Sequence, residues 1–237
     1  MGMSSDGAIT TSDETPLALK QGPLRRLLRT PQWSTFPGQL AFVWCLLNLL
    51  LFGALIVLGD TGARGVAAEI GLWVPLSLAA ARVMPSRLGP LSYLSAVAAL
   101  ALIEETIAYM TGGGLHGTAT SLPMDWVRAV PTFEGLGAGL LVASRWSGLS
   151  PSEMFSAAAI AGVVIEIGLG SRFNPVVLLA LSGAVAWVYG SILALPFEPR
   201  SLRGPRWVRY AVTAALMATG AVLGGFLGIG LQSALRL

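Results

Sequence analysis

Long apolar stretches alternate with short polar segments over most of the chain, from residue 38 almost to its end. The clearest stretch covers residues 38–59. At about 1.5 Å per residue in a helix, it is long enough to cross the roughly 30 Å of hydrocarbon in a bilayer. The pattern predicts an all-α fold, a polytopic bundle of about seven transmembrane helices. The expected spans are about 38–59, 65–84, 91–112, 132–147, 154–169, 174–196 and 208–232.

Two of the expected spans are less regular than the others. The second contains Glu69 and Pro75, and a proline inside a helix removes a backbone hydrogen bond, so we expect a kink there. The fourth is short and begins near Glu134. The fifth follows residues 150–153 (Ser-Pro-Ser-Glu), where a serine, a proline and an early acid favour the start of a helix.

The beginning of the chain has a different character from the rest. We predict a disordered, basic juxtamembrane tail at 1–36 and a transmembrane helical domain at 37–237. Residues 1–16 are polar and contain no apolar core, unlike a signal peptide. Residues 17–30 mix leucines with basic residues, a pattern that favours a segment on the membrane surface. These basic residues are Lys20, Arg25, Arg26 and Arg29.

The composition narrows the class of protein. Hydrophobic residues make up 54% of the chain and charged residues 11%, which is too little charge to cover a soluble domain of 237 residues. The net charge is +3, but the arginines lie in short segments between apolar stretches and form no basic face, which argues against nucleic acid as a partner. We expect a multi-pass protein of the cell membrane, in contact with membrane lipids.

The basic residues also predict the orientation of the helices. With the N-terminus in the cytoplasm and the C-terminus outside, seven spans place most of the 15 basic residues on the cytoplasmic side. This is the distribution that the positive-inside rule requires. The exceptions, expected outside, are Arg64, Arg128, Arg172 and Arg236.

The third expected span contains two adjacent carboxylates, Glu104 and Glu105, well inside its apolar sequence. An acidic side chain at mid-membrane costs roughly 2.5–3.5 kcal/mol on insertion scales, so the pair predicts a buried polar site. In the expected orientation, Glu134 lies at the outer end of the fourth span and Glu166 in the last turns of the fifth. We expect these four carboxylates to converge near the outer surface, with Glu104 and Glu105 as the candidate catalytic residues.

Other side chains are candidates for binding at the same site. Tyr109 follows Glu105 by one helical turn and can donate a hydrogen bond. The segment 115–131 contains Trp126 and is expected to lie across the outer mouth of the site as an interfacial loop. The further candidates, placed in the outer segments, are His116, Asp125, Arg128 and Arg172.

Helical spacing indicates which carboxylate of the pair faces inward. Glu105 shares a stripe with Ala101 and Ala108, and small residues mark the faces on which membrane helices approach closely. Glu104 shares a bulkier stripe with Leu100 and Ile107. Glu105 is therefore the preferred interior side chain.

Glycines recur at intervals of four residues in two of the later spans. Gly135 and Gly139 follow Glu134, and the last span contains Gly220, Gly224 and Gly228. Small residues at this spacing let membrane helices pack backbone against backbone. For the last span we interpret the pattern purely as tight packing.

Two resemblances concern the glutamate pair only. Residues 104–109, Glu-Glu-Thr-Ile-Ala-Tyr, resemble the Glu-Glu-x-x-x-Arg signature of CAAX-type intramembrane proteases, although Tyr109 replaces the arginine and His116 is the single histidine. A glutamate pair ahead of an aromatic is also similar to a motif of membrane-bound lycopene cyclases, in which a proline precedes the acids; here Leu102 and Ile103 precede them. Either resemblance implies a membrane-embedded enzyme that uses carboxylate acid–base chemistry on a lipid or isoprenoid.

Three functions fit these observations. With one histidine and one cysteine, Cys45, the chain offers no zinc ligand set, and we assign no metal site. The preferred hypothesis is an outward-facing intramembrane site that binds or conducts a small cation or a proton. The alternatives are the membrane-embedded enzyme, and a structural subunit in which arginines such as Arg128 and Arg172 neutralise Glu134 and Glu166 without chemistry.

Overall fold

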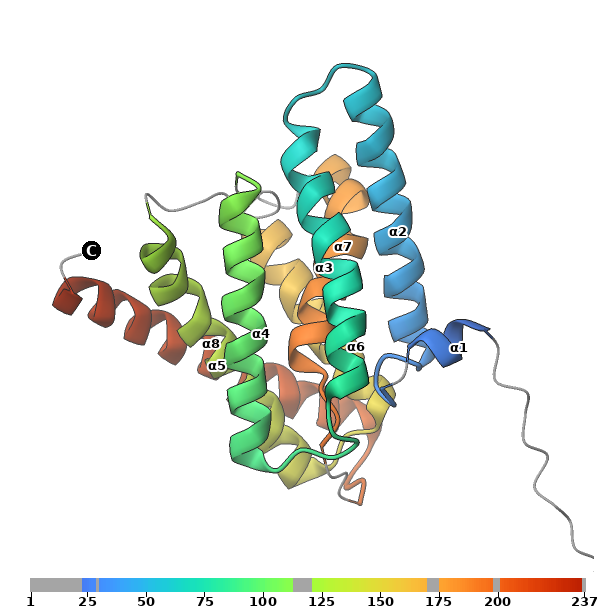
Figure 1. Ribbon diagram of the computed structural model, residues 1–237. Helices are drawn as coiled ribbons and strands as arrows, with labels where there is room; N and C mark the ends of the chain where they lie inside the picture. The colour runs from blue at the N-terminus through green and yellow to red at the C-terminus, as the bar shows by residue number, and fades with distance from the viewer. Residues whose placement is uncertain (1–22, 29, 113–120, 170–174, 198–200, 236–237) are drawn as a thin grey trace, which may run out of the picture.

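The computed structural model describes residues 23–28, 30–112, 121–169, 175–197 and 201–235, and every element in these residues is a helix. Helices α2, α3, α4 and α7 run alongside one another, while α8 crosses the bundle obliquely (Figure 1). In chain order the elements are α1 (Pro23–Leu27), α2 (Phe36–Val57), α3 (Ala63–Val83), α4 (Pro90–Met110), α5 (Leu122–Ser147), α6 (Pro151–Gly162), the π-helix η1 (Val163–Leu169), α7 (Pro175–Leu193) and α8 (Arg206–Leu235).

Five of these helices, α2, α3, α4, α7 and α8, are long and apolar enough to cross a membrane. They coincide with the first, second, third, sixth and seventh expected spans, and they make the chain a multi-pass membrane protein. Helix α3 continues as one helix through Pro75. Helix α5 and the α6–η1 run occupy the fourth and fifth expected spans, but they are not among the five. Seven crossings and an N-terminus in the cytoplasm therefore stay predictions.

Helix α5 begins well before the start expected at residue 132. Its first residue is Leu122, so the expected interfacial loop at 115–131 is wrong for its second half. The local sequence explains the early start, because Pro123 falls in the first turn and Asp125 follows it. Proline fits the first turn of a helix, and an acid there interacts favourably with the helix dipole.

Helix α7 forms the centre of the bundle. Almost every side chain from Gly183 to Leu193 is buried. Two indole groups connect it to α3: Trp73 donates a hydrogen bond to the Ser191 hydroxyl at 3.0 Å, and Trp187 donates one to Ser77 at 3.3 Å. Polar groups in an apolar interior are stable when they pair in this way, so the two bonds fix α3 against α7.

Further hydrogen bonds attach α2 and α4 to the same central helix. The Asn48 side-chain oxygen of α2 accepts a hydrogen bond from the Ala184 backbone N–H at 2.9 Å. The Tyr93 hydroxyl of α4 donates to the Leu193 carbonyl oxygen at 2.7 Å. Helix α7 is thus held from three sides, and the carboxylates discussed below come from elements packed around it.

Helices α5 and α8 pack through their glycines. A Cβ atom added to Gly135 would overlap the carbonyl oxygen of Gly220, and one added to Gly224 would overlap that of Pro131. A Cβ atom on Gly228 would lie 2.6 Å from the Val127 carbonyl oxygen. The backbones of the two helices are therefore in direct contact over several turns, which confirms the tight packing predicted for the last span.

The start of α6 is joined to α8 by an ion pair. Ser150 and Glu153 form a capping box, in which the Glu153 carboxylate accepts a hydrogen bond from the Ser150 N–H at 2.9 Å. Arg209 of α8 donates to the same carboxylate, and Arg206 lies 3.7 Å from it. Burial of Glu153 opposes its ionisation, but the hydrogen bonds from Arg209 and Ser150 outweigh it and hold the pKa of the carboxyl below its ordinary value.

The described part of the N-terminal region packs on the bundle. Leu28 and Trp33 are fully buried, and the Trp33 indole donates a hydrogen bond to the Ala194 carbonyl oxygen at 3.1 Å. Residues 1–22 lie outside the described residues. The disordered tail and the domain boundary after residue 36 therefore stay predictions.

Candidate functional site

Both carboxylates of the glutamate pair are buried. Glu104 has no exposed surface and Glu105 is 8% exposed. The preference for Glu105 as the interior side chain is therefore not upheld, because the bulkier stripe of α4 also faces inward. Val97 of that stripe lies against Gly137 of α5, where the missing side chain leaves room for it. The interior face of α4 is wide enough to hold both acids.

The π-helix η1 carries Glu166, which is half-buried. The Tyr189 hydroxyl of α7 donates a hydrogen bond to this carboxylate. The tyrosine ring lies directly against Gly162 and packs on Phe133, with 4.8 Å between ring centroids. Helix α6 changes to the wider π-helix directly before Glu166, and π-helical segments are rare and occur frequently at functional sites.

Tyr189 interacts with carboxylates from two separate elements. The charges of Glu166, Glu104 and Glu105 all act electrostatically on its hydroxyl group. The glutamate pair of α4 is therefore near enough for its charge to act on this phenol, and Glu166 of η1 accepts its hydrogen bond. We refer to Glu104, Glu105, Glu166 and Tyr189 as the Tyr189 cluster.

Asp125 lies at the level of the glutamate pair. It is buried, with 8% of its surface exposed, in the first turn of α5. The neighbouring Trp126 donates a hydrogen bond to the Thr106 hydroxyl of α4 at 3.2 Å. Because Thr106 directly follows Glu105, this bond sets the start of α5 beside the turn that carries the pair. Asp125 was expected in a loop, and the structure brings it into the helical bundle.

Glu134 takes a different place from the one expected. Since α5 begins at Leu122, Glu134 lies in the middle of that helix and not at its outer end. Its carboxylate lies close to the Ala98 backbone of α4 and acts electrostatically on Tyr93. Ala98 precedes Glu104 by nearly two turns of α4. The structure therefore places Glu134 beside a part of α4 that is nearly two turns away from the glutamate pair.

The remaining predicted site residues are less informative. Tyr109 is half-buried in the last turn of α4, and Arg128 is exposed on α5. His116 and Arg172 lie outside the described residues. The binding roles assigned to these four side chains stay predictions.

Two buried groups were not predicted to take part in the site. Tyr189 lies in an almost entirely apolar span. Its hydroxyl is the feature of that span from which a site residue could have been predicted. Glu69 is fully buried on α3, which contacts both α4 and α7. The available signal for Glu69 is an acid inside an expected span.

Two hollows on the described surface lie away from the carboxylates. One is formed by Leu102, Ile103, Thr106, Ile107 and Trp126, on the face of α4 opposite the buried pair. The other lies between α2 and α6. Neither is lined by a glutamate, so neither provides the apolar groove beside Glu105 that an enzyme acting on a lipid would need.

The positions of the potential ligands bear on metal binding. Within the described residues, no group of three or more histidine, cysteine, aspartate or glutamate side chains is placed so that it could hold a metal ion.

Comparison with protein-family models, curated proteins and solved structures found no match to this chain. The function therefore has to be inferred from the residues themselves. What they show is a multi-pass membrane protein with buried glutamates, Glu69, Glu104 and Glu105. Carboxyl groups and a phenol are groups that can accept, hold and donate protons.

Proposed function

We propose that the Tyr189 cluster binds and exchanges a proton within the membrane. The observation that carries the proposal is the hydrogen bond that the Tyr189 hydroxyl donates to Glu166, on a phenol that the charges of the buried Glu104 and Glu105 also influence. Acidic residues inside membrane-spanning segments are costly and are commonly parts of proton relays and ion pathways. The glutamate pair and the tyrosine lie on helices long and apolar enough to span the membrane.

A proton fits the arrangement better than a metal cation does. A cation that leaves water needs several oxygen ligands around one point; Ca²⁺, for example, takes about 6–8. The described residues offer no group of three or more potential ligands at one point. A proton needs only one carboxylate and a neighbouring hydrogen-bond partner, and Glu166 with Tyr189 supplies that pair.

The roles within the cluster follow from burial and hydrogen bonding. Glu105 is slightly exposed whereas Glu104 is not, so Glu105 is the group that takes up the proton from outside the cluster. Tyr189 then connects the α4 carboxylates to Glu166 through its hydroxyl, which can donate one hydrogen bond while accepting another. With the predicted orientation, the site opens toward the outer side of the membrane.

The test is a proton-flux measurement on the purified protein in liposomes that contain a pH-sensitive dye, with the membrane potential set by potassium and valinomycin. We expect Glu105→Gln to reduce the flux to the level of protein-free liposomes, because the amide cannot carry the proton. Asp60→Asn is the matched control: Asp60 is exposed in the α2–α3 turn, where its side chain accepts hydrogen bonds from Gly62 and Ala63. Wild-type protein without flux, or Glu105→Gln with undiminished flux, would exclude the proposal.

A further inference from the structure

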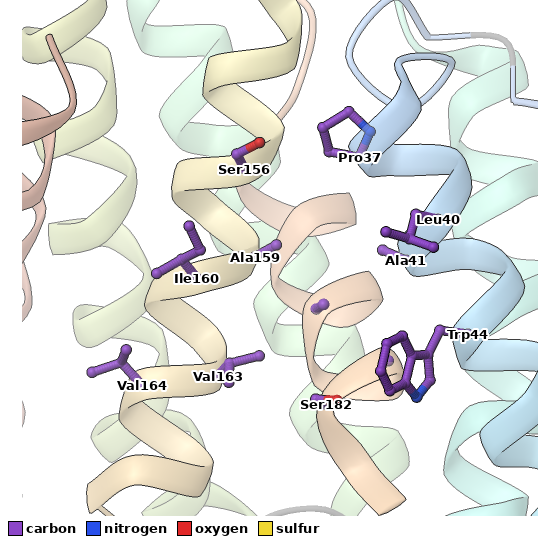
Figure 2. Close-up of a pocket in the computed structure, with 12 residues that line it drawn as sticks. Pro37, Leu40, Ala41, Trp44, Ser156, Ala159, Ile160, Val163, Val164 and Ser182 are labelled. Atoms are coloured by element: carbon purple, nitrogen blue, oxygen red, sulfur yellow. The ribbon is translucent and has the colours of Figure 1, made fainter. Parts of the chain in front are cut away.

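An apolar groove opens on the side of the bundle between α2 and α6. Its volume is about 320 Å³. Figure 2 shows Trp44 of α2 projecting into it, with Ala159 and Val163 facing Trp44 from the other wall. The floor is formed by Ser182, Gly183 and Ala186 of α7. The groove contains no charged side chain.

We propose that this groove holds an acyl chain of a bilayer phospholipid. Helices α2 and α7, which form one wall and the floor, are both long and apolar enough to span a membrane. The groove therefore faces the hydrocarbon of the bilayer, where acyl chains are the molecules available to fill it. An acyl chain is apolar, as are most of the residues that line the groove.

The dimensions favour a single chain over a helix from a partner protein. Helices α2 and α6 contact each other as well as α7, so the space between them is narrow. An α-helix with its side chains is about 10–12 Å across and would have to push the two apart. A volume of about 320 Å³ is at the lower end of the range of roughly 300–1,000 Å³ for small-ligand sites.

The Trp44 indole packs closely on the floor of the groove. A Cβ atom on Gly183 would overlap the Trp44 ring and lie 2.7 Å from the Asn48 side-chain oxygen. The indole thus rests on the glycine, beside the asparagine that accepts a hydrogen bond from Ala184. This contact supports the indole from the α7 side, and the groove is open beside it without a ligand.

Native mass spectrometry of protein purified with added dioleoyl phosphatidylcholine tests the proposal. We expect wild-type protein to retain a bound phospholipid after detergent washing. Ala159→Phe fills the groove and should abolish this retention. Ala79→Phe, at an exposed alanine on α3, is the matched control and should retain the lipid. Should Ala159→Phe fail to fold, Ala186→Leu fills the groove from its floor.

A second measurement uses Trp44 as the reporter. The difference in fluorescence between wild-type protein and Trp44→Phe isolates this indole, and we expect phosphatidylcholine with brominated acyl chains to quench it. The quenching should persist after detergent washing that removes free lipid. Equal lipid retention by the Ala159→Phe and Ala79→Phe variants, no retention by wild-type protein, or Trp44 fluorescence that brominated chains leave unchanged would each overturn the proposal. None of these results depends on proton exchange at the Tyr189 cluster.

Discussion

The Tyr189 hydroxyl is the smallest feature on which the proposed function depends. It is the group that bonds to Glu166 while the charges of Glu104 and Glu105 act on it. Hydrogen bonds to charged groups contribute roughly 1.5–3 kcal/mol to stability. The ring itself packs against Gly162 and Phe133 and does not need the hydroxyl to stay in place. The chemical and structural contributions of this residue are therefore separable.

Tyr189→Phe removes the hydroxyl and keeps the ring. We expect a strong reduction in proton flux in the liposome assay, with a loss of stability of about 1.5–3 kcal/mol, the usual size for a hydrogen bond to a charged group. The unfolding midpoint in detergent measures the second effect. Tyr210→Phe, on a half-buried tyrosine of α8 next to Arg206, serves as the control and should alter neither quantity. Normal flux in Tyr189→Phe would remove the tyrosine from the relay.

The ion pair between Glu153 and Arg209 predicts a pH-dependent stability. Because the pKa of Glu153 is lowered in the folded protein, the pair stabilises the fold above the ordinary glutamate pKa of about 4.3. This stabilisation is lost as the pH falls through the lower, folded-state pKa. We therefore expect wild-type protein to unfold at a higher temperature than Glu153→Gln from pH 8 to pH 5, and the difference to shrink below about pH 4. A difference that stays constant to pH 3 would contradict this account.

At the level of elements, the α5–α8 contact depends on the absence of side chains. Gly220 lies against the Gly135 carbonyl oxygen, whereas a Cβ atom on Gly225, on the other side of the same helix, would meet nothing within 4 Å. We expect Gly220→Ala to destabilise the protein by about 1–3 kcal/mol, the cost of overpacking a close contact. Gly225→Ala should leave stability unchanged or raise it, since alanine favours the helix. Thermal unfolding in detergent measures both variants, and equal midpoints would contradict the close packing.

The sequence was sufficient for some elements and not for others. The five long helices followed from apolar length, and the glycine spacing of α8 predicted a close contact without identifying α5 as its partner. The start of α5 was missed because its first turns contain Asp125 and Arg128 and therefore look like a loop. The pattern of apolar and polar residues in Val163–Leu169 does not indicate the change from α6 to the π-helix η1.

The candidate site, like the fold, could be predicted only in part from the sequence. Burial of Glu104 and Glu105 followed from two acids in an apolar stretch, since only the bundle interior can hold them. The place of Glu134 depended on the start of α5, so the error there moved it by several turns. Tyr189 could not be singled out, because a tyrosine in an apolar span is common and its partner Glu166 belongs to another element.

For the whole molecule, the direction in which the chain crosses the membrane is testable by cysteine labelling. Cys45 is buried, and Cys45→Ala gives a background without thiols. On this background, Thr61→Cys in the α2–α3 turn should react with a membrane-impermeant maleimide on intact cells, because the prediction places it outside. Ser86→Cys, after α3, should react only once the cells are made permeable. Both positions are exposed in the structure, and the reverse labelling pattern would invert the topology.

The oblique course of α8 has a consequence for the membrane around the protein. Its 30 residues make a helix about 45 Å long, well beyond the roughly 30 Å of hydrocarbon. Helix α8 runs obliquely to α2, α3, α4 and α7 while it packs along α5 through its glycines (Figure 1). Because a long helix fits a bilayer by tilting, we expect a thicker bilayer to favour a smaller tilt of α8 and so to strain these contacts. The length of the lipid tails is therefore expected to affect the stability of the α5–α8 contact. In nanodiscs of increasing tail length, we expect the unfolding midpoint to respond less once Gly220→Ala has already loosened that contact.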